Sequence, residues 1–302
     1  MGISVFPDDD QLFCGMIGTH GVKMANAAVN ECDVLFLVGA RVGDRAVKTP
    51  LALEKTTKII HIDIDPAEIG KNIGADLPLV GDAKLVLQQM TELAKPMKHD
   101  EWIAHIKTLG GERKYVEPAK GTVNPRVFID RLAKKMPANV TVVADVGQNQ
   151  IWTCTEYKFR KEGRLLTSGG MGTMGYSVPA AIGAKMADDS RATVAICGDG
   201  AFQMSFMELA TAVQFGVDIK VAVMTNNRLG MVRELQTNGY HDRQTAVFLD
   251  GSPDFIKLAE AYGIPAMRVY DDATMEKGVE MLAEHKGICL VEVVVDKDMP
   301  TL

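Results

Sequence analysis

The sequence predicts an α/β protein made of two doubly wound parallel-sheet domains. Apolar runs of strand length alternate with helical patterns along the chain, and parallel strands need helical crossovers of this kind. A stretch rich in proline and glycine interrupts the alternation. The length of 302 residues suits about two domains. We therefore expect a first domain over residues 1–95, a linker over 96–124 and a second domain over 125–302.

Two apolar runs, 33–39 and 58–64, are predicted as the strands of the first domain, with helices at 24–30 and 82–94. The chain opens in loop-like sequence, with no capped helix or strand before the first element. We therefore expect this domain to be incomplete at its start.

The second domain repeats the alternation after a mixed-charge helical piece at 102–109 in the linker. Its predicted strands are 140–145, 193–198, 219–225 and 289–295, and its predicted helices are 125–135, 179–186, 203–215, 254–262 and 273–285. Pro125 and Pro179 suit first-turn positions of helices. Ligands of an open parallel sheet bind at the carboxyl ends of the strands, so we expect the site in the loops after Asp145, Gly198 and Thr225.

Composition excludes several classes of function. The net charge is −6 at pH 7 and aromatic residues make up 6%, which argues against a nucleic-acid partner. The five cysteines are odd in number and form no CxxC pair, so a disulfide framework or zinc site is not expected. No signal peptide or membrane-length apolar run is visible. We expect a cytoplasmic protein with no membrane partner.

A candidate metal site follows two of the predicted strands. Gly198, Asp199 and Gly200 end one strand, and Asn226 and Asn227 end the next, 27 positions after Asp199 (226 − 199). A strand–helix–strand unit of that length brings both side chains to one sheet edge. Carboxylate and amide oxygens suit Mg²⁺, and glycines at a helix start suit an anion. Alternatively Asp199 is an ordinary turn residue, but the spacing favours the site.

This pattern resembles the thiamine-diphosphate motif, in which GDG is followed by NN. The segment 168–181 resembles the G-x-M-G-x-x-x-P-A-A segment of that family, 145–150 resembles DVGQHQ, and Gly230-Met231-Val232 follows the metal loop as expected. Among these enzymes the chain most resembles the acetolactate synthase large catalytic subunit, without its N-terminal pyrimidine domain.

The resemblance implies roles for individual residues. Asp199 and Asn226 would hold Mg²⁺ by side chains and Arg228 by its backbone carbonyl. Met174 would be the apolar wedge under the cofactor, although a lone methionine is more commonly generic core. The residues implied to bind thiamine diphosphate are Val146, Gly147, Gln148, Asn149, Gly172, Met174, Gly198, Gly200, Ala201, Gly230, Met231 and Val232.

Two departures from the family pattern carry predictions. Asn149 replaces the usual histidine of DVGQHQ, so one diphosphate hydrogen bond changes type. Leu235 stands where the family often has a tryptophan that narrows the second-substrate pocket. We therefore expect a reduced preference for 2-ketobutyrate over pyruvate, and weaker binding of herbicides that stack there.

The first domain resembles the FAD-binding central domain of acetolactate synthases at 15–21, 39–45, 61–71 and 81–83. The resemblance implies FAD in a structural rather than redox role. Arg41 and Arg45 can instead form interdomain salt bridges, Gly43 departs from the usual aspartate, and related enzymes bind ADP or nothing here. The residues implied are Gly18, His20, Gly39, Arg41, Arg45, Asp63, Ile64 and Asp82.

The implied function is carboligation of two 2-ketoacids, pyruvate with pyruvate or 2-ketobutyrate, with loss of CO₂, in branched-chain amino-acid biosynthesis. The activating glutamate lies in the pyrimidine domain, and neither Glu208 nor Glu234 matches its position. We therefore expect no catalytic residue in this chain, and expect another polypeptide or second subunit to supply that domain. A small regulatory subunit is also implied. Another thiamine-diphosphate decarboxylase or oxidase, or a non-catalytic cofactor-binding fragment, are the alternatives.

Overall fold

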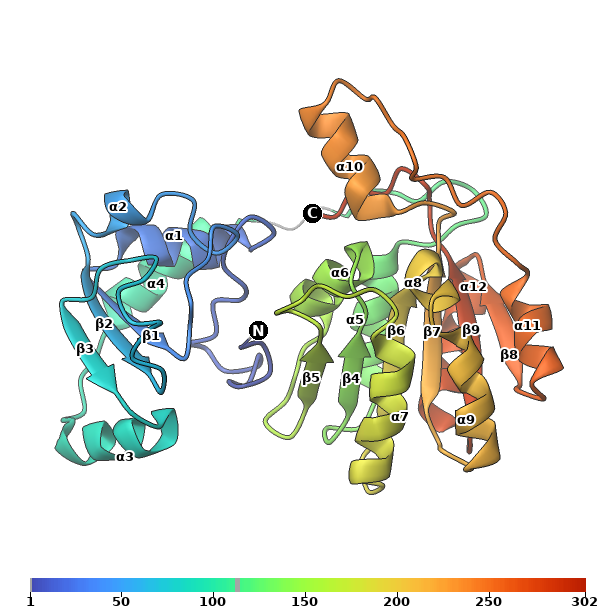
Figure 1. The fold of residues 1–302 in the computed structure, drawn as a ribbon, viewed down its shortest axis with the longest axis horizontal. Coiled ribbons are helices and arrows are strands. Elements are labelled where there is room, and N and C mark those ends of the chain that lie inside the picture. The colour runs from blue at the N-terminus through green and yellow to red at the C-terminus, as the bar shows by residue number, and fades with distance from the viewer. Residues whose placement is uncertain (1, 112–114) are drawn as a thin grey trace. The chain divides into compact units, whose positions relative to one another are not determined.

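The structure, a computed structural model, describes residues 2–111 and 115–302. These residues form two compact units (Figure 1). One unit contains residues 14–111, and the other contains residues 2–13 together with 115–302. Each unit is built on a parallel sheet with helices, so the predicted α/β class is confirmed.

The smaller unit has a three-stranded parallel sheet in the order β1-β2-β3. Its buried core includes Leu37, Leu53 and Ile59. Both strands predicted here are present, whereas β3 and α2 were not predicted. Helix α4 lies within the stretch 96–124 and packs on α1, where His105 contacts Glu31 at 2.6 Å. The elements are α1 Lys23–Glu31, β1 Val34–Val38, α2 Pro50–Leu53, β2 Lys58–Asp63, β3 Leu77–Val80, α3 Ala83–Leu93 and α4 Asp100–Leu109.

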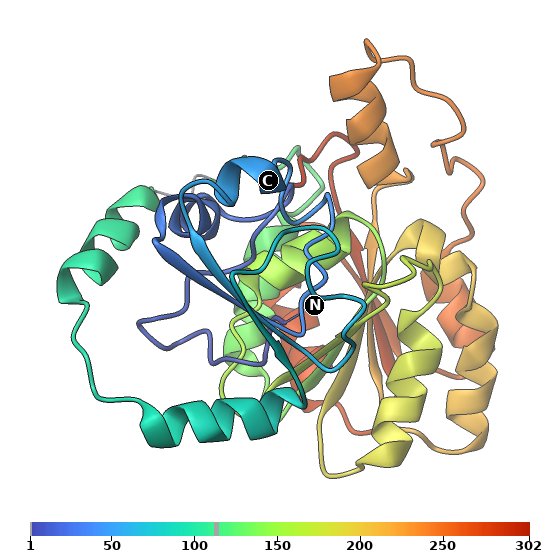
Figure 2. The ribbon, with the colours of Figure 1, turned by 60° about the vertical axis from the view of Figure 1, so that its left-hand side comes forward.

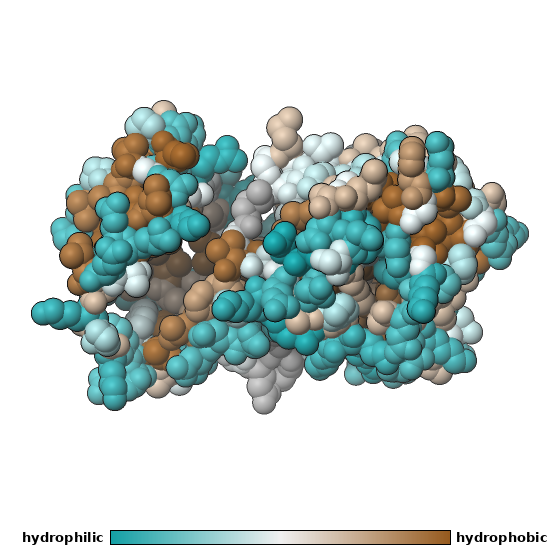
Figure 3. Space-filling view, turned by 90° about the horizontal axis from the view of Figure 1, so that it is seen from below, coloured by the Kyte–Doolittle hydropathy of each residue, from teal (hydrophilic) through white to brown (hydrophobic). Residues whose placement is uncertain are grey.

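One feature of the smaller unit is its apolar surface, which Figure 3 shows as brown patches. Val34, Phe36 and Val38 of β1 and Leu77 and Val80 of β3 are all exposed. The described helices of this unit therefore cover its sheet incompletely.

The larger unit has a six-stranded parallel sheet in the order β5-β4-β6-β7-β9-β8. Figures 1 and 2 show helices on both of its faces, with α7 and α9 on one side and α5 and α12 on the other. The elements are α5 Pro125–Lys135, β4 Thr141–Ala144, α6 Gln148–Glu156, β5 Arg164–Thr167, α7 Ser177–Ala187, β6 Thr193–Gly198, α8 Asp199–Gln203, η1 Phe206–Glu208, α9 Leu209–Gln214, β7 Lys220–Thr225, α10 Gly230–Gly239, α11 Phe255–Ala261, β8 Ala266–Val269, α12 Asp272–Glu284 and β9 Cys289–Val294.

Local sequence explains several helix starts in this unit. Asn124 caps α5 by accepting hydrogen bonds from the N–H groups of the next turn, and Pro125 occupies the first helical position. Asp271 and Thr274 form a capping box at the start of α12. Pro179 lies two residues inside α7 rather than at its start, but still in the first turn.

The strand order places a topological switch between β4 and β6. The chain leaves β4 for β5 on one side and returns through β6 on the other side. In the register, Ala144 pairs with Ile196 and Gly198 pairs with Met224, so β4, β6 and β7 end close together. Ligands of open α/β sheets bind at such a point, and this is where the sequence predicted the site.

The predicted helix over 203–215 is replaced by three shorter pieces. Helix α8 starts directly at Asp199, and a bend at Ser205 (φ −143°) precedes a 3₁₀ turn and then α9. The ring of Phe202 packs edge-on against Phe255 with the centroids 5.3 Å apart. The apolar pattern runs through the bend because residues on both sides of it reach the same core.

Among residues 2–111 and 115–302, no helix is both long enough and apolar enough to cross a bilayer.

Residues 2–13 are joined to the rest of the larger unit through Asp8. The Asp8 N–H donates to the Phe159 carbonyl (2.8 Å), and the Asp8 carboxylate accepts from the Phe159 N–H (3.1 Å). Burial raises the pKa of Asp8 from 3.8 to about 6. Because the pKa is raised in the folded state, the contribution of Asp8 to the free energy of unfolding is fully present below pH 3.8. This contribution is lost as the pH rises through about 6.

We therefore expect Asp8→Asn to raise Tm at pH 8 by about 1–2 °C, because the group is partly exposed and its effect is screened. The gain should shrink at pH 4.5, in thermal melts compared with the exposed control Asp9→Asn. The same gain at both pH values would contradict this account of Asp8.

Candidate functional site

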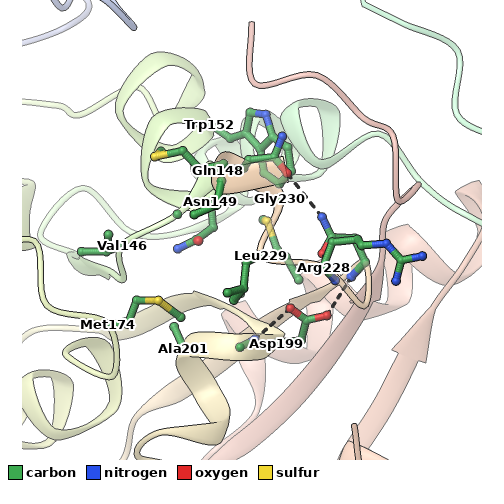
Figure 4. Close-up of a pocket in the computed structure, with 17 residues that line it drawn as sticks. Val146, Gln148, Asn149, Trp152, Met174, Asp199, Ala201, Arg228, Leu229 and Gly230 are labelled. Atoms are coloured by element: carbon green, nitrogen blue, oxygen red, sulfur yellow. Dashed lines mark hydrogen bonds between the residues drawn. The ribbon is translucent and has the colours of Figure 1, made fainter. Parts of the chain in front are cut away.

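A pocket lies at the carboxyl ends of β4, β6 and β7, where α6, α8 and α10 begin (Figure 4). The structure brings all the predicted thiamine- and metal-site residues together there except Gly172, which is not among the described lining residues. Three lining residues were not predicted: Trp152, Met224 and Leu229. The pocket is lined by Val146, Gly147, Gln148, Asn149, Trp152, Met174, Gly198, Asp199, Gly200, Ala201, Met224, Asn226, Arg228, Leu229, Gly230, Met231 and Val232.

Asp199 is a buried carboxylate at the end of β6. One oxygen accepts a hydrogen bond from the Gly200 N–H (2.8 Å), and the other accepts from the N–H groups of Asn226 (3.1 Å) and Asn227 (2.6 Å). Burial raises the pKa of Asp199 to about 6, against the lowering effect of these hydrogen bonds. The ends of β6 and β7 are thus joined through this one side chain.

The turn after β7 follows from the asparagine pair. The Asn226 side-chain oxygen accepts from the N–H of Arg228 at 3.0 Å, and Asn227 takes the left-handed conformation (φ 53°), which asparagine tolerates better than most residues. The Arg228 guanidinium turns away to Asp250 (3.0 Å) and stacks over Phe248. This leaves the backbone of the turn, rather than the arginine charge, at the pocket.

The groups gathered here suit a hard cation. Asp199 contributes a carboxylate and Asn226 an amide oxygen, and the backbone of Arg228 lines the same pocket. No group of three or more histidine, cysteine, aspartate or glutamate side chains with metal-binding geometry occurs in the described residues, so a nitrogen- or sulfur-rich zinc site is not formed by them. An all-oxygen set with room for phosphate oxygens matches Mg²⁺.

Glycines let the backbone lie close to the pocket. A Cβ at Gly200 would lie 2.7 Å from Leu229 Cδ2, and one at Gly230 would lie 1.9 Å from Gln148 Oε1. Gly147 has φ 143° at the start of α6. The first backbone N–H groups of α6 and α10 have no partners within their helices, which suits an anionic ligand.

Met174 lies beside this cradle, on the loop that precedes α7. Its Cε would be 3.4 Å from a Cβ at Gly200, and Figure 4 shows its side chain next to Ala201. The loop is anchored by Asp145, which is fully buried and accepts hydrogen bonds from the N–H groups of Gly175 (3.0 Å) and Ser177 (2.8 Å). Asp145 therefore fixes where Met174 enters the pocket.

The Asn149 side chain joins the carboxyl ends of β4 and β6. Its side-chain nitrogen donates to the carbonyls of Asp145 (2.8 Å) and Ile196 (3.1 Å), at the ends of β4 and β6. Its oxygen therefore faces Gly147 and Gly198, and would lie 2.7 Å from a Cβ at Gly147. Because both side-chain N–H bonds point into the protein, this side chain offers the pocket an acceptor, and its hydrogen-bond type differs from that of a donor histidine.

The residues implied for FAD lie in the smaller unit. The N–H of Gly39 donates to Ile62 at the ends of β1 and β2 (2.8 Å). The Asp63 carboxylate accepts from the Asp65 N–H (2.9 Å), and Asp82 caps α3 by accepting from Leu85 (3.1 Å). These two carboxylates therefore already have partners in their own loops.

Two further residues of that set are held at the Gly18 loop. Gly18 approaches the backbone of Arg45 so closely that a Cβ would lie 2.3 Å from its carbonyl oxygen, and the Thr19 N–H donates to that oxygen (2.8 Å). Ile64, after β2, is 71% exposed, so it is open to a ligand rather than part of the core.

Oxygen groups suited to a divalent cation, next to a glycine cradle at the switch point of a parallel sheet, are typical of enzymes that bind a diphosphate cofactor. Residues 145–293 match the thiamine pyrophosphate enzyme C-terminal TPP binding domain, and residues 1–90 match the thiamine pyrophosphate enzyme central domain. The chain therefore belongs to the thiamine pyrophosphate enzymes.

Within that class the chain is similar to acetolactate synthase large subunits. It is 40% identical to a probable acetolactate synthase large subunit of Methanocaldococcus jannaschii and 36% identical to the acetolactate synthase large subunit of Lactococcus lactis, in each case over 98% of this chain and 52% of the relative. It is 35% identical to the large subunit of acetolactate synthase isozyme 3 of Escherichia coli, over 98% of this chain and 54% of the relative. The chain thus spans about half the length of these relatives.

Proposed function

We propose that this chain is the diphosphate- and metal-binding part of an acetolactate synthase catalytic subunit. With a pyrimidine domain supplied, it would join pyruvate to a second pyruvate or to 2-ketobutyrate with loss of CO₂, in branched-chain amino-acid biosynthesis. The observation that carries this proposal is the meeting of Asp199 with the Asn226–Asn227 turn in one glycine-lined pocket. Relatives with the corresponding name, over nearly the whole chain, support it.

In this proposal the chain binds the metal ion and the cofactor and orients them. Asp199, Asn226 and the Arg228 carbonyl would hold Mg²⁺, and backbone N–H groups of Gly147, Gln148, Asn149, Gly200 and Ala201 would hold the diphosphate. When bound, thiamine diphosphate supplies the carbanion chemistry that releases CO₂ and forms the new carbon–carbon bond. Met174 would be the apolar wedge under the cofactor, and Met231 and Val232 of α10 would border the second substrate.

Activation of the cofactor is proposed to come from a pyrimidine domain on another polypeptide or second subunit. The two glutamates considered in the sequence have other partners: Glu208 accepts from the Thr211 hydroxyl (2.8 Å), and Glu234 accepts from the Thr301 N–H (3.1 Å). These contacts support the proposal that neither carboxylate activates the cofactor. A small regulatory subunit is a further proposed partner.

The test combines binding and product analysis. The full 302-residue chain is titrated with thiamine diphosphate at several Mg²⁺ concentrations, then assayed with pyruvate alone and with an added pyrimidine-domain polypeptide. We expect Mg²⁺-dependent binding, and acetolactate when that domain is present. Acetaldehyde as the main product would identify a decarboxylase, and binding without turnover in the mixture would identify a non-catalytic fragment; absence of binding would overturn the proposal.

Acceptor choice gives a prediction at Leu235, which is 61% exposed on α10, one turn after Met231 in the pocket wall. Leu235 is not among the residues that line the pocket. The larger side chain of Leu235→Trp would add apolar surface toward the proposed acceptor site, where one methylene of substrate changes binding by about 1–3 kcal/mol. In the reconstituted enzyme we expect the preference for 2-ketobutyrate over pyruvate to rise by roughly tenfold. A competition assay with both acceptors measures this preference, with Leu235→Phe as a bulky control without an indole. An unchanged preference in Leu235→Trp would contradict a role for position 235 in acceptor choice.

FAD is proposed for the domain 1–95, which the linker 96–124 joins to the diphosphate domain 125–302. The support is that Arg41 follows β1 and Asp63 ends β2; these two strands are parallel neighbours, so both residues belong to the carboxyl edge of the small sheet. We expect purified chain to take up FAD without changing its redox state during turnover. Chain that shows no flavin absorbance after incubation with FAD and gel filtration would refute this proposal.

We also propose that the protein works in the cytoplasm. The support is its cysteine usage, because the five cysteines carry no disulfide among the described residues.

A further inference from the structure

We propose that the side chain of Gln148 is a positioning residue that sets the orientation of the Asn226 amide for metal binding. This inference rests on the proposed function, since it concerns the same Mg²⁺ site. It adds a role for a side chain whose backbone N–H alone was expected to act. Gln148 lies 78 positions before Asn226, at the start of α6, and only 4% of it is exposed.

The contact fixes which atom of Asn226 is presented to a cation. The Asn226 side-chain nitrogen donates to Gln148 Oε1 at 3.3 Å, and its oxygen accepts from the Arg228 N–H at 3.0 Å. A carboxamide turned by half a rotation would present N–H donors where the cation needs an oxygen. Gln148 therefore favours the rotamer in which the oxygen of Asn226 can act as a ligand.

Gln148 can do this because its own amide is oriented by three acceptors. Its Nε2, which carries two N–H hydrogens, lies within hydrogen-bond distance of the Met299 carbonyl (2.9 Å), the Thr301 hydroxyl (3.2 Å) and Glu234 (3.3 Å), so the acceptors on this side outnumber its hydrogens. With the nitrogen directed to this side, the oxygen faces Asn226. Arg233 also donates to the Met299 carbonyl (3.2 Å), so α6, α10 and the segment 299–301 form one hydrogen-bonded support.

Gly230 gives independent support for a required position of Gln148. A Cβ at Gly230 would lie 1.9 Å from Gln148 Oε1 and 2.9 Å from the Asn226 side-chain nitrogen. Gly230 has no positive φ that would itself demand glycine. Its missing side chain is therefore explained by the space that this hydrogen-bonded pair occupies.

The first test replaces Gln148 by methionine, which keeps the length but cannot accept the Asn226 hydrogen bond. Groups that orient a metal ligand typically change metal affinity by about 10–100-fold. We expect Gln148→Met to raise the Mg²⁺ concentration for half-maximal thiamine diphosphate binding by at least about tenfold, measured calorimetrically on the full chain. Affinity for the cofactor at saturating Mg²⁺ should change much less.

Gln150→Met is the matched control, because Gln150 is on the same helix and bonds Thr167 (2.7 Å) outside the pocket lining. It should leave the Mg²⁺ requirement unchanged. Gln148→Met with the wild-type Mg²⁺ requirement would overturn the positioning role. Wild-type chain that binds no thiamine diphosphate at any Mg²⁺ concentration would instead remove the proposed function on which the inference rests.

A double-mutant cycle separates positioning from a general loss of folding. Gly230→Ala should raise the Mg²⁺ requirement, because its methyl group displaces Gln148 Oε1. In a Gln148→Ala background the added methyl group has room, so the further effect of Gly230→Ala should be markedly smaller. Equal effects of Gly230→Ala in both backgrounds would show that Gly230 acts independently of Gln148 and would count against the proposal.

Discussion

Replacing Asp199 by asparagine is expected to abolish Mg²⁺-dependent binding of thiamine diphosphate. The carboxylate accepts three backbone hydrogen bonds, and it is the negatively charged group proposed to bind the cation. Asparagine has one acceptor oxygen, and its NH₂ group would face backbone N–H donors or the cation itself. Removing a group that only orients a metal ligand lowers metal affinity by about 10–100-fold. Removing the charged ligand itself should therefore lower it on the order of a hundredfold or more.

The measurement is calorimetric titration of the full chain with thiamine diphosphate at fixed Mg²⁺, and with Mg²⁺ at fixed cofactor. Asp272→Asn is the control, since Asp272 is an exposed aspartate that pairs with Arg131 (3.2 Å); it should bind like wild type. Tight, Mg²⁺-dependent binding by Asp199→Asn would mean that the cation is held elsewhere and would remove the central support for the proposed function.

Spacing made the centre of the site predictable. Asp199 and Asn226 each follow a continuous apolar run, and a strand–helix–strand unit leaves its two strand ends at the same sheet edge. The strands 193–198 and 219–225 were predicted within one residue of β6 and β7. The meeting of the two residues then followed from topology alone, without knowledge of the intervening helix, which was in fact broken at Ser205.

Other elements gave no comparable signal. Helix α6 has two threonines and no side-chain cap, and α10 begins and ends on glycine, so neither showed a strong helical pattern. The strands β3, β5 and β8 have four residues each and lie at sheet edges. Their formation depends on pairing with a neighbour, which local sequence does not encode.

Hydrogen bonds between residues far apart in the sequence could not be predicted from the sequence either. The contact of Gln148 with Asn226 spans 78 positions and that of Asp145 with Ser177 spans 32. Both join loops whose mutual placement is set by sheet order. Resemblance to a family assigned backbone roles around these residues, but the hydrogen bonds of the side chains became visible only in three dimensions.

The second large effect is expected at Asp145, which joins β4 to the Met174 loop. Asp145→Asn keeps the shape but not the acceptors: the carboxylate accepts from the N–H groups of Val146 (2.8 Å), Gly175 (3.0 Å) and Ser177 (2.8 Å) in a fully buried position. One asparagine oxygen cannot serve both sides, so at least one buried N–H and the new NH₂ group lose partners. We expect a loss of about 2–4 kcal/mol in the free energy of unfolding of the larger unit.

The loop should also loosen around Met174, which lowers affinity for thiamine diphosphate even at saturating Mg²⁺. This pattern is the reverse of that expected for Gln148→Met, in which the Mg²⁺ requirement changes and cofactor affinity at saturation is largely kept. Urea denaturation and calorimetric titration measure the two effects, with Asp189→Asn as control, because Asp189 is 92% exposed and its ion pair with Lys185 contributes about 0–1 kcal/mol. If Asp145→Asn unfolds like that control, the Met174 loop is held by other contacts and Asp145 has no part in shaping the pocket.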